Sequence, residues 1–157
     1  LKRHPDKDIR FLMVGDSREY EYERSIHRMI EEIEMREKFI FTGNLSDMPP
    51  VYKDIDILVL PSLREGFGRV VVEAEALENP VIVSNAGGLV EVVEHEKTGY
   101  IFDLEHEEEM LEYLDRLCGD EKLRKRLGKA GRDHVSKNFS QETMIEDVTN
   151  LYLDLLK

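Results

Sequence analysis

The feature that most constrains the fold is a regular alternation of short apolar runs with longer amphipathic segments. Five runs are almost continuously apolar, and they stand at residues 9–15, 38–43, 56–62, 80–84 and 99–102. Runs of this length and composition are typical of strands buried on both faces of a parallel sheet. The alternation therefore predicts an α/β fold, in which helices cover both faces of a parallel sheet.

The segments between and after these runs have the apolar spacing of amphipathic helices. They stand at residues 19–37, within 44–54, at 68–77 and 88–94, and, after the last run, at 105–118, 120–136 and 141–156. The last three predict three consecutive C-terminal helices. Because no linker, internal repeat or low-complexity tract interrupts this order, we expect residues 1–157 to form a single domain.

Composition and charge argue against several classes of function. The chain of 157 residues carries 34 acidic and 22 basic side chains, a formal net charge of −12, which disfavours a nucleic-acid partner. The short basic cluster at 122–129 is interleaved with leucines, as is typical of the solvated side of a helix. Cys118 is the only cysteine, so no internal disulfide or cysteine-based zinc site is expected. No apolar run approaches the roughly 18 residues that span a bilayer, and we expect a cytoplasmic protein.

Glycine-rich and polar loops follow four of the predicted strands. They read VGDS, FTGN, LPSLREGFG and VSNAGG and begin at residues 14, 41, 60 and 83. The carboxyl ends of parallel strands lie at one edge of a sheet, and ligands of α/β proteins bind beyond that edge. We therefore expect the four loops to converge on one binding site.

The third of these loops leads directly into a predicted helix and has the chemistry of an anion site. Gly66 and Gly68 permit tight turns and let a ligand approach the main chain. The first turn of the helix offers unpaired amides, those of Arg69 and Val70 among them, and the helix dipole adds partial positive charge. Together these features predict a phosphate site.

Two glutamates, Glu65 and Glu73, stand eight positions apart at this site. Eight helical residues rise about 12 Å at roughly 1.5 Å per residue, which is about the reach from a sugar past a diphosphate to a ribose. Since carboxylates accept hydrogen bonds from vicinal hydroxyls, Glu65 would hold a hexose and Glu73 a ribose. Spacing alone leaves open that Glu73 is a surface residue of an ordinary helix and that Glu65 only flanks the helix start.

The segment 56–102 also contains an ordered series of short motifs. They are Pro61-Ser62, Glu65-Gly66-Phe67-Gly68, Glu73-Ala74, Ala76, Pro80-Val81, Gly87-Gly88, Glu91 and Thr98-Gly99. This series resembles the donor-binding segment of the family 4 glycosyltransferases, which are built from two Rossmann-like domains. Because MVGDS, FIFTGNLSD and KAGRDHVSKNFS also resemble family patterns in the expected order, the resemblance covers nearly the whole chain. It implies a Rossmann-like domain, the C-terminal one that binds the nucleotide sugar.

The resemblance implies a sugar-binding and catalytic role for the loop. Glu65 and the main chain of Gly66, Phe67 and Gly68 would contact the donor sugar. The enzyme would be a hexosyltransferase-type transferase that retains the anomeric configuration and needs no metal or other cofactor. Glu65 would be the catalytic residue, acting to position the sugar in an oxocarbenium-like state more than as a nucleophile.

The remaining contacts with the donor also follow from the resemblance. The amides of Arg69 and Val70 would bind the diphosphate, and Glu73 would bind the ribose. Asn44 and Leu45, which follow the run at 38–43, would lie near the base. The identity of the base and of the sugar stays open.

Two parts of the family pattern have no counterpart in this chain. The family domain opens with a central strand and an Arg…Lys pair that clamp the diphosphate, and nothing before the run at 9–15 matches them. The N-terminal acceptor-binding domain is absent as well. We therefore expect the protein's own N-terminal domain, or a neighbouring chain, to complete the sheet, and the chain alone to be inactive. The sequence does not identify the acceptor, which is a glycan, a lipid-linked molecule or a small molecule. Attachment to the membrane surface through the missing domain also stays open.

A third departure follows Glu73. Where the family has Glu-Ala-Met-Ala-x-Gly-x-Pro, this chain reads EAEALENP, so that Glu75 replaces a methionine and Glu78 replaces a glycine. We expect Asn79 to adopt the left-handed backbone conformation that the glycine would supply. If it does not, the turn before the run at 80–84 is strained.

Other interpretations of the sequence stay open. The chain could be a non-catalytic module that binds a nucleotide sugar, or an epimerase of the same two-domain plan, whose motifs match less well. It could also be an interaction domain such as an acidic flavodoxin-like receiver. That last interpretation predicts an acidic pocket around Asp16 and Asp56 that holds a divalent ion, but the sequence lacks the nearby lysine and the acid pair that such a pocket needs. Separately, the five histidines show no metal-ligand spacing.

Overall fold

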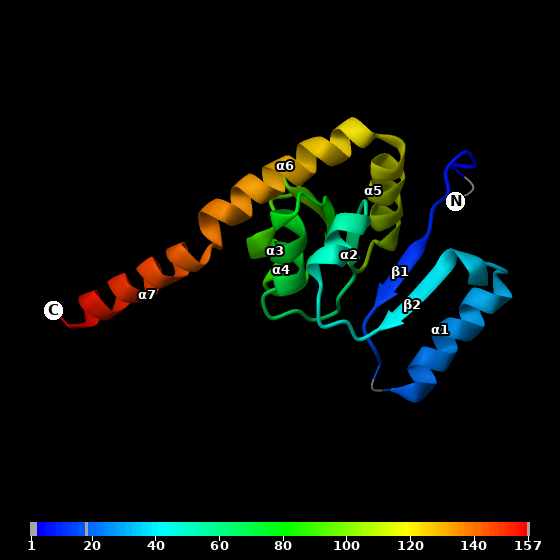
Figure 1. Cartoon of the computed structure of the whole chain (residues 1–157), viewed down its shortest axis with the longest axis horizontal. Coiled ribbons are helices and arrows are strands. Elements are labelled where there is room, and N and C mark those ends of the chain that lie inside the picture. The colour runs from blue at the N-terminus through cyan, green and yellow to red at the C-terminus, as the bar shows by residue number, and fades with distance from the viewer. Residues whose placement is uncertain (1–2, 18, 157) are drawn as a thin grey trace. The chain divides into compact units, whose positions relative to one another are not determined.

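The computed structural model describes residues 3–17 and 19–156 (Figure 1). The chain divides into two compact units, Leu1–Met48 and Pro49–Lys157. Each unit contains its own parallel strands and its own helices. The α/β class predicted from the sequence is confirmed.

The first unit is a strand–helix–strand segment. Strand β1 (Phe11–Val14) pairs in parallel with β2 (Phe39–Gly43). Helix α1 (Tyr20–Glu32) and the short 3₁₀ helix η1 (Arg36–Lys38) connect them. A parallel pair needs such a crossover, because its strands run in the same direction.

Helix α1 ends before residue 37, where its apolar spacing predicts the end. Glu34 has a φ of 55°, in the left-handed region, which interrupts the helical backbone. The amide of Met35 then donates to the carbonyl of Ile30 at 3.2 Å, and η1 follows as a separate turn. The prediction was too long because side-chain spacing reports which face is apolar and carries no information on backbone angles.

The second unit holds three parallel strands with helices around them. The strands, in the order in which they pair, are β3 (Leu58–Leu60), β4 (Val81–Ser84) and β5 (Gly99–Phe102). The helices are α2 (Pro49–Asp54), α3 (Arg69–Ala76), α4 (Leu89–Val92), α5 (Glu107–Gly119), α6 (Glu121–Asn138) and α7 (Gln141–Leu155). Their order is the predicted one, including the three C-terminal helices.

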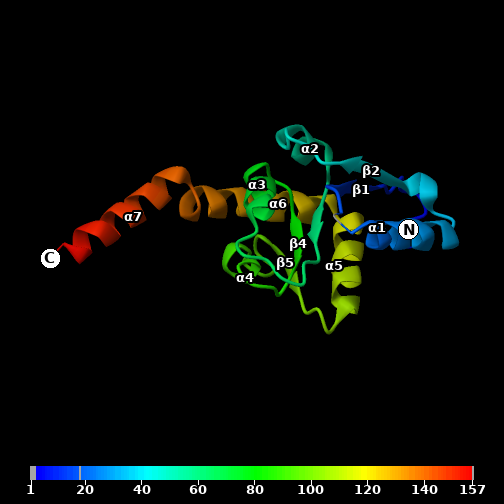
Figure 2. The ribbon, with the colours of Figure 1, turned by 90° about the horizontal axis from the view of Figure 1, so that it is seen from below.

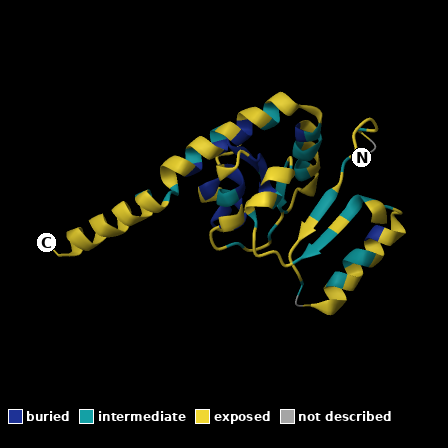
Figure 3. Cartoon of the chain, viewed as in Figure 1, coloured by how far each residue is buried: buried dark blue, intermediate teal, exposed yellow. Residues whose placement is uncertain are grey.

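Strand β4 is the centre of the second unit, and all four of its residues are buried. Five buried apolar side chains form the core cluster: Ile82, Tyr100, Phe102, Leu117 and Leu127. Figure 2 shows α3 and α5 on opposite sides of the strands of this unit, and Figure 3 shows the buried residues gathered around these strands. Burial on both faces explains why the β4 run is continuously apolar.

The strands form two sheets where the sequence predicts one. Strands β1 and β2 make one sheet and β3-β4-β5 the other, and no pairing joins the two among the described residues. Strand β3 is therefore an edge strand. Its three apolar residues are only partly buried, whereas those of β4 are fully buried, because an edge strand lacks a neighbour on one side.

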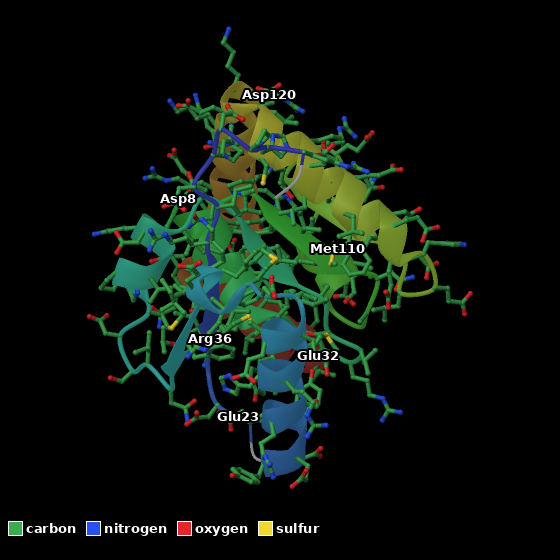
Figure 4. All side chains as sticks on the ribbon, turned by 90° about the vertical axis from the view of Figure 1, so that its right-hand side faces the viewer. Asp8, Glu23, Glu32, Arg36, Met110 and Asp120 are labelled. Atoms are coloured by element: carbon green, nitrogen blue, oxygen red, sulfur yellow. The ribbon has the colours of Figure 1, made fainter. Side chains whose placement is uncertain are left out.

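Polar caps separate the C-terminal helices. Asp120, labelled in Figure 4, accepts a hydrogen bond from the amide of Leu123 at 3.0 Å and so caps α6. Ser140 caps α7 in the same way by accepting from the amide of Thr143 at 3.1 Å. None of the residues of α7 is buried. Among the described residues, no helix combines the length and the apolar character needed to cross a membrane.

Candidate functional site

The loop after β3 rests on the glycine pair that precedes α4. The amide of Gly88 donates to the carbonyl of Glu65 at 3.2 Å. A Cβ on Gly88 would lie 2.5 Å from the carbonyl oxygen of Gly66, and a Cβ on Gly87 would overlap that of Glu65. Gly87 also has a φ of 53°. Two loops that are far apart in sequence thus pack backbone against backbone, which only glycine permits here.

Gly68 begins α3 with a left-handed φ of 87°. Its carbonyl accepts hydrogen bonds from the amides of Val71 at 2.8 Å and Val72 at 3.3 Å. Neither the Arg69 amide nor the Val70 amide donates to an acceptor within residues 3–17 and 19–156. The first turn of α3 therefore has two free N–H groups, as an anion site at a helix start requires.

Glu65 lies at the start of this turn and is half-buried. Its Oε1 accepts a hydrogen bond from the amide of Gly66 at 3.1 Å. The carboxylate is thus held by the main chain of the loop that the sequence assigns to the donor sugar. Phe67, in the same loop, packs edge-on against Phe139, with the ring centroids 5.7 Å apart.

Glu73 lies one turn further along α3 and is held at both of its oxygens. The hydroxyl of Tyr52 donates to its Oε2 at 2.8 Å, and the Nε of Arg69 lies 3.5 Å from its Oε1. The Glu73 side chain is 40% exposed, so the carboxylate still faces solvent. This arrangement leaves it room to accept further hydrogen bonds from a ligand.

Tyr52, on α2, is a part of the site that the sequence analysis missed. The residue is only 2% exposed. Burial, together with the neighbouring Glu73 carboxylate, raises the pKa of Tyr52 well above its ordinary value, so the phenol stays protonated and remains a donor. Nothing in PPVYKD separates this tyrosine from an ordinary core aromatic, and only the contact with Glu73 reveals its role.

Asn44 and Leu45, the residues expected near the base, lie in the first unit. Both are exposed, and the Nδ2 of Asn44 donates to the Oδ2 of Asp16 at 3.0 Å. Of the acids on which the receiver interpretation depends, Asp16 has this amide as its partner, and Asp56 lies 3.9 Å from Arg124. No three His, Cys, Asp or Glu side chains of the described residues are grouped as a metal ion would need. The structure gives the receiver interpretation no support.

The turn after α3 corrects one expectation. Glu78, and not Asn79, adopts the left-handed conformation, with a φ of 64°. Asn79 is buried instead, and its Nδ2 donates to the carbonyls of Tyr52 at 2.7 Å and Ala74 at 3.3 Å. The reason is that the turn needs a positive φ at the position of the family glycine itself, while the next side chain is needed to hold α2 and α3 together.

Glu75, which replaces the family methionine, is fully buried between α3 and α6. A Cβ on Gly131 of α6 would lie only 3.0 Å from its Cγ. Neither carboxyl oxygen has a hydrogen-bond partner of good geometry. Burial raises the pKa of Glu75 to about 7, an effect that the nearby hydroxyl of Thr98 only partly offsets.

A hollow of about 550 Å³ lies at the opposite, amino-terminal ends of β3 and β4. None of the predicted site residues lines it. Two of its basic side chains already have acidic partners, since Lys125 lies 2.6 Å from Glu121 and Arg124 lies 3.9 Å from Asp56. Tyr52 and Asn79 do line the hollow, so it lies behind the residues that hold Glu73 and not at the loop and helix start described above.

Comparison with known proteins gives one matching family. The sequence profile described as Glycosyl transferases group 1 matches residues 1–134. The match includes both glutamates, the loop between β3 and α3, and the glycine pair on which that loop rests.

Individual relatives are similar over most of this chain but are much longer. Capsular polysaccharide biosynthesis glycosyltransferase CapM of Staphylococcus aureus is 36% identical over 118 residues, which are 75% of this chain and 31% of CapM. A solved glycosyltransferase from Rickettsia africae superposes with a TM-score of 0.88 at 30% identity, covering 98% of this chain and 41% of that one. HepE of Anabaena, solved with UDP and glucose, superposes with a TM-score of 0.85 at 25% identity, covering 91% and 40%. The chain thus spans about a third to two fifths of the length of these proteins.

Proposed function

Because the chain belongs to the family of group 1 glycosyl transferases, we propose that it is the C-terminal, donor-binding domain of a longer retaining glycosyltransferase. The domain binds a nucleotide-diphosphate sugar. In the longer protein, the glycosyl group passes to an acceptor with retention of the anomeric configuration.

The observation that carries this proposal is the start of α3. The amides of Arg69 and Val70 are free to donate, and carboxylates stand on either side of them, at Glu65 and Glu73. Two N–H groups at a helix start suit a diphosphate, while carboxylates suit the hydroxyls of the two sugars. The presence of UDP and glucose in the structure of HepE, which is similar to this chain, supports the same ligand class.

The chemistry follows from these groups. As the bond from the sugar to the diphosphate breaks, negative charge grows on the leaving diphosphate, and the two amides stabilise it without needing to reorient. Glu65, held by the amide of Gly66, positions the sugar hydroxyls while the anomeric carbon gains positive charge. Catalysis needs no metal and no other cofactor in this proposal.

The remaining partners lie outside the chain. The open edge of β3, with its half-buried apolar residues, suits a further strand from the protein's own N-terminal part or from a neighbouring chain. The acceptor, which is a glycan, a lipid-linked molecule or a small molecule, binds to that other part. We accordingly expect the chain alone to bind its donor weakly and to be inactive in transfer. In the cell, the whole enzyme acts in the cytoplasm or at the membrane surface.

The experiment that tests donor binding is a calorimetric titration of UDP-, GDP- and ADP-sugars into the chain. We expect binding in the millimolar range for one of them and a loss of about tenfold in Glu73→Ala, which corresponds to about 1.4 kcal/mol for one charge-assisted contact. Glu112→Ala is the matched control, because Glu112 is an exposed glutamate in the middle of α5 and its removal changes the net charge equally.

Equal binding by the unmodified chain and by Glu73→Ala would contradict the ribose role of Glu73. Transfer is tested separately with the longer protein. Product analysis by NMR would reveal an inverted anomeric centre if the proposal of retention is wrong. Donor binding without any transfer would favour a non-catalytic binding module instead.

A further inference from the structure

The contact between Tyr52 and Glu73 joins two helices through a buried hydrogen bond. The donor hydroxyl belongs to a residue that is 2% exposed, and it lies 2.8 Å from Oε2 of a carboxylate that is 40% exposed. One oxygen of Glu73 is thus tied to the interior of the unit, while the side chain as a whole still faces solvent. A hydrogen bond from a neutral donor to a charged carboxylate is stronger than one between neutral groups.

The backbone of Tyr52 is itself held in place by a second buried side chain. The Nδ2 of Asn79 donates to the carbonyl of Tyr52 at 2.7 Å and to that of Ala74 at 3.3 Å. Asn79 is 4% exposed. Since Ala74 lies next to Glu73 on α3, the amide of Asn79 fixes α2 against the helix that carries the carboxylate.

The other contact of Glu73 is much weaker. The Nε of Arg69 lies 3.5 Å from Oε1, and the Arg69 side chain is 86% exposed. Exposed ion pairs within a helix constrain their side chains little, because solvent screens them and both side chains lose rotamer freedom. The orientation of the Glu73 carboxylate is therefore decided by Tyr52.

We propose that Tyr52 is a positioning residue, which orients the Glu73 carboxylate toward the donor's ribose and thereby sets the preference for ribose over 2′-deoxyribose. This inference rests on the proposed function, because it assigns a role relative to the same ligand. Two adjacent hydroxyls can both donate to a carboxylate only when its plane is correctly turned. A carboxylate that is free to rotate spends part of its time in other orientations, and it therefore discriminates less well between ribose and 2′-deoxyribose.

The test compares the affinities for UDP and for 2′-deoxy-UDP in the full chain, with GDP and ADP and their 2′-deoxy forms measured in parallel. We expect the unmodified chain to prefer UDP by about tenfold, the factor that corresponds to 1.4 kcal/mol. Tyr52→Phe keeps the ring and removes only the hydroxyl, and the preference should fall to about threefold or less. Glu73→Ala should abolish the preference, and adding Tyr52→Phe to it should change nothing further.

Tyr113→Phe is the matched control. Tyr113 lies on α5 and stacks on Tyr100, so loss of its hydroxyl should leave both affinities unchanged. Thermal unfolding followed by circular dichroism checks that Tyr52→Phe is folded. A purely structural role of Tyr52 would weaken the binding of UDP and of 2′-deoxy-UDP by the same factor, and such a result would overturn the inference.

The outcomes separate this inference from the proposed function. If Glu73→Ala loses the ribose preference while Tyr52→Phe keeps it in full, the positioning role of Tyr52 is wrong and the donor site stands. If Glu73→Ala binds both nucleotides as the unmodified chain does, the ribose role of Glu73 is wrong, and the inference fails with it. If none of the nucleotides binds to the unmodified chain, both are overturned.

Discussion

A residue with a left-handed backbone conformation stands at each end of helix α3, but the two ends use different residue types for it. At the N-terminal end, the left-handed backbone position is occupied by a glycine, Gly68, and the neighbouring loops approach each other through Gly87 and Gly88. At the C-terminal end, the left-handed position is occupied by Glu78. The last turn of the helix also places an acidic residue, Glu75, on its buried face. The N-terminal end has the residue type that is usual for a left-handed conformation, which is glycine. The C-terminal end has glutamates at a left-handed position and at a buried position, where glutamate is unusual.

This difference reflects what each end must approach. At the N-terminal end, the loop contacts the main chain of a second loop at Gly87 and Gly88, where even one methyl group has no space. In the proposed function, the same loop must also contact a ligand. At the C-terminal end, other side chains offset the departure at Glu78, whereas the oxygens of the buried Glu75 carboxyl group have no hydrogen-bond partner of good geometry among the described residues. Arg132 donates to Glu78 at 2.8 Å, and Asn79 bonds to the carbonyl of Ala74. The comparison predicts that substitutions are costly at the first end and beneficial at the second.

The largest expected effect is at the N-terminal end. In Gly87→Ala, the new methyl group overlaps the carbonyl oxygen of Glu65, and the φ of 53° adds strain. We expect a loss of about 3 kcal/mol in the free energy of unfolding, measured by urea denaturation. Gly66→Ala is the control, because a Cβ there meets nothing within 4 Å, and its stability should change by less than about 1 kcal/mol. Equal losses in both variants would mean that the close approach of the loops does not cause the loss of stability in Gly87→Ala.

The next effect concerns the buried acid at the other end. The folded state keeps the proton of Glu75 up to a pKa of about 7, whereas the ordinary value is 4.5. The folded state therefore binds more protons between these values, and the free energy of unfolding should fall as the pH rises from 4.5 to 7. Glu75→Met should remove most of this loss and raise stability at pH 7.5 by about 2 kcal/mol.

Urea denaturation across pH 4.5–8 measures this effect in the unmodified chain and in Glu75→Met. Glu75→Gln should flatten the pH dependence in the same way, with a smaller gain because the buried amide stays polar. Glu112→Gln on the exposed face of α5 should leave the slope unchanged. A pH dependence that persists in Glu75→Met would assign it to other groups.

The smallest effect is expected at Glu78. Glu78→Gly removes the strain of a left-handed glutamate, which costs roughly 1–2 kcal/mol, and also removes the ion pair with Arg132, which is half-exposed and worth at most about 1 kcal/mol. We expect a net gain of about 0.5 kcal/mol, measured as the denaturation midpoint. Arg132→Gln removes the ion pair alone and should be slightly destabilising. A loss of stability in Glu78→Gly would show that the ion pair outweighs the strain.

Much of the fold and part of the site could be predicted because they depend on local properties. The apolar runs at 80–84 and 99–102 predicted β4 and β5, and the glycines of the loop at 60–68 predicted a helix start with free amides. The length of α1 and the position of the left-handed residue after α3 could not be predicted, because they depend on backbone angles at Glu34 and Glu78 that side-chain spacing does not reveal.

The amino-acid sequence by itself determined the order of strands and helices, the glycine-rich loop that leads into α3, and the presence of a carboxylate on each side of the helix start. Periodicity, turn residues and helix dipoles act over a few neighbouring residues, so they can be recognised in the chain alone. Only the tertiary structure decided that Tyr52 holds Glu73, that Asn79 connects α2 to α3, and that Glu75 is buried against α6, away from solvent. These features depend on how closely segments far apart in sequence approach one another, and burial and hydrogen bonding arise only from that approach.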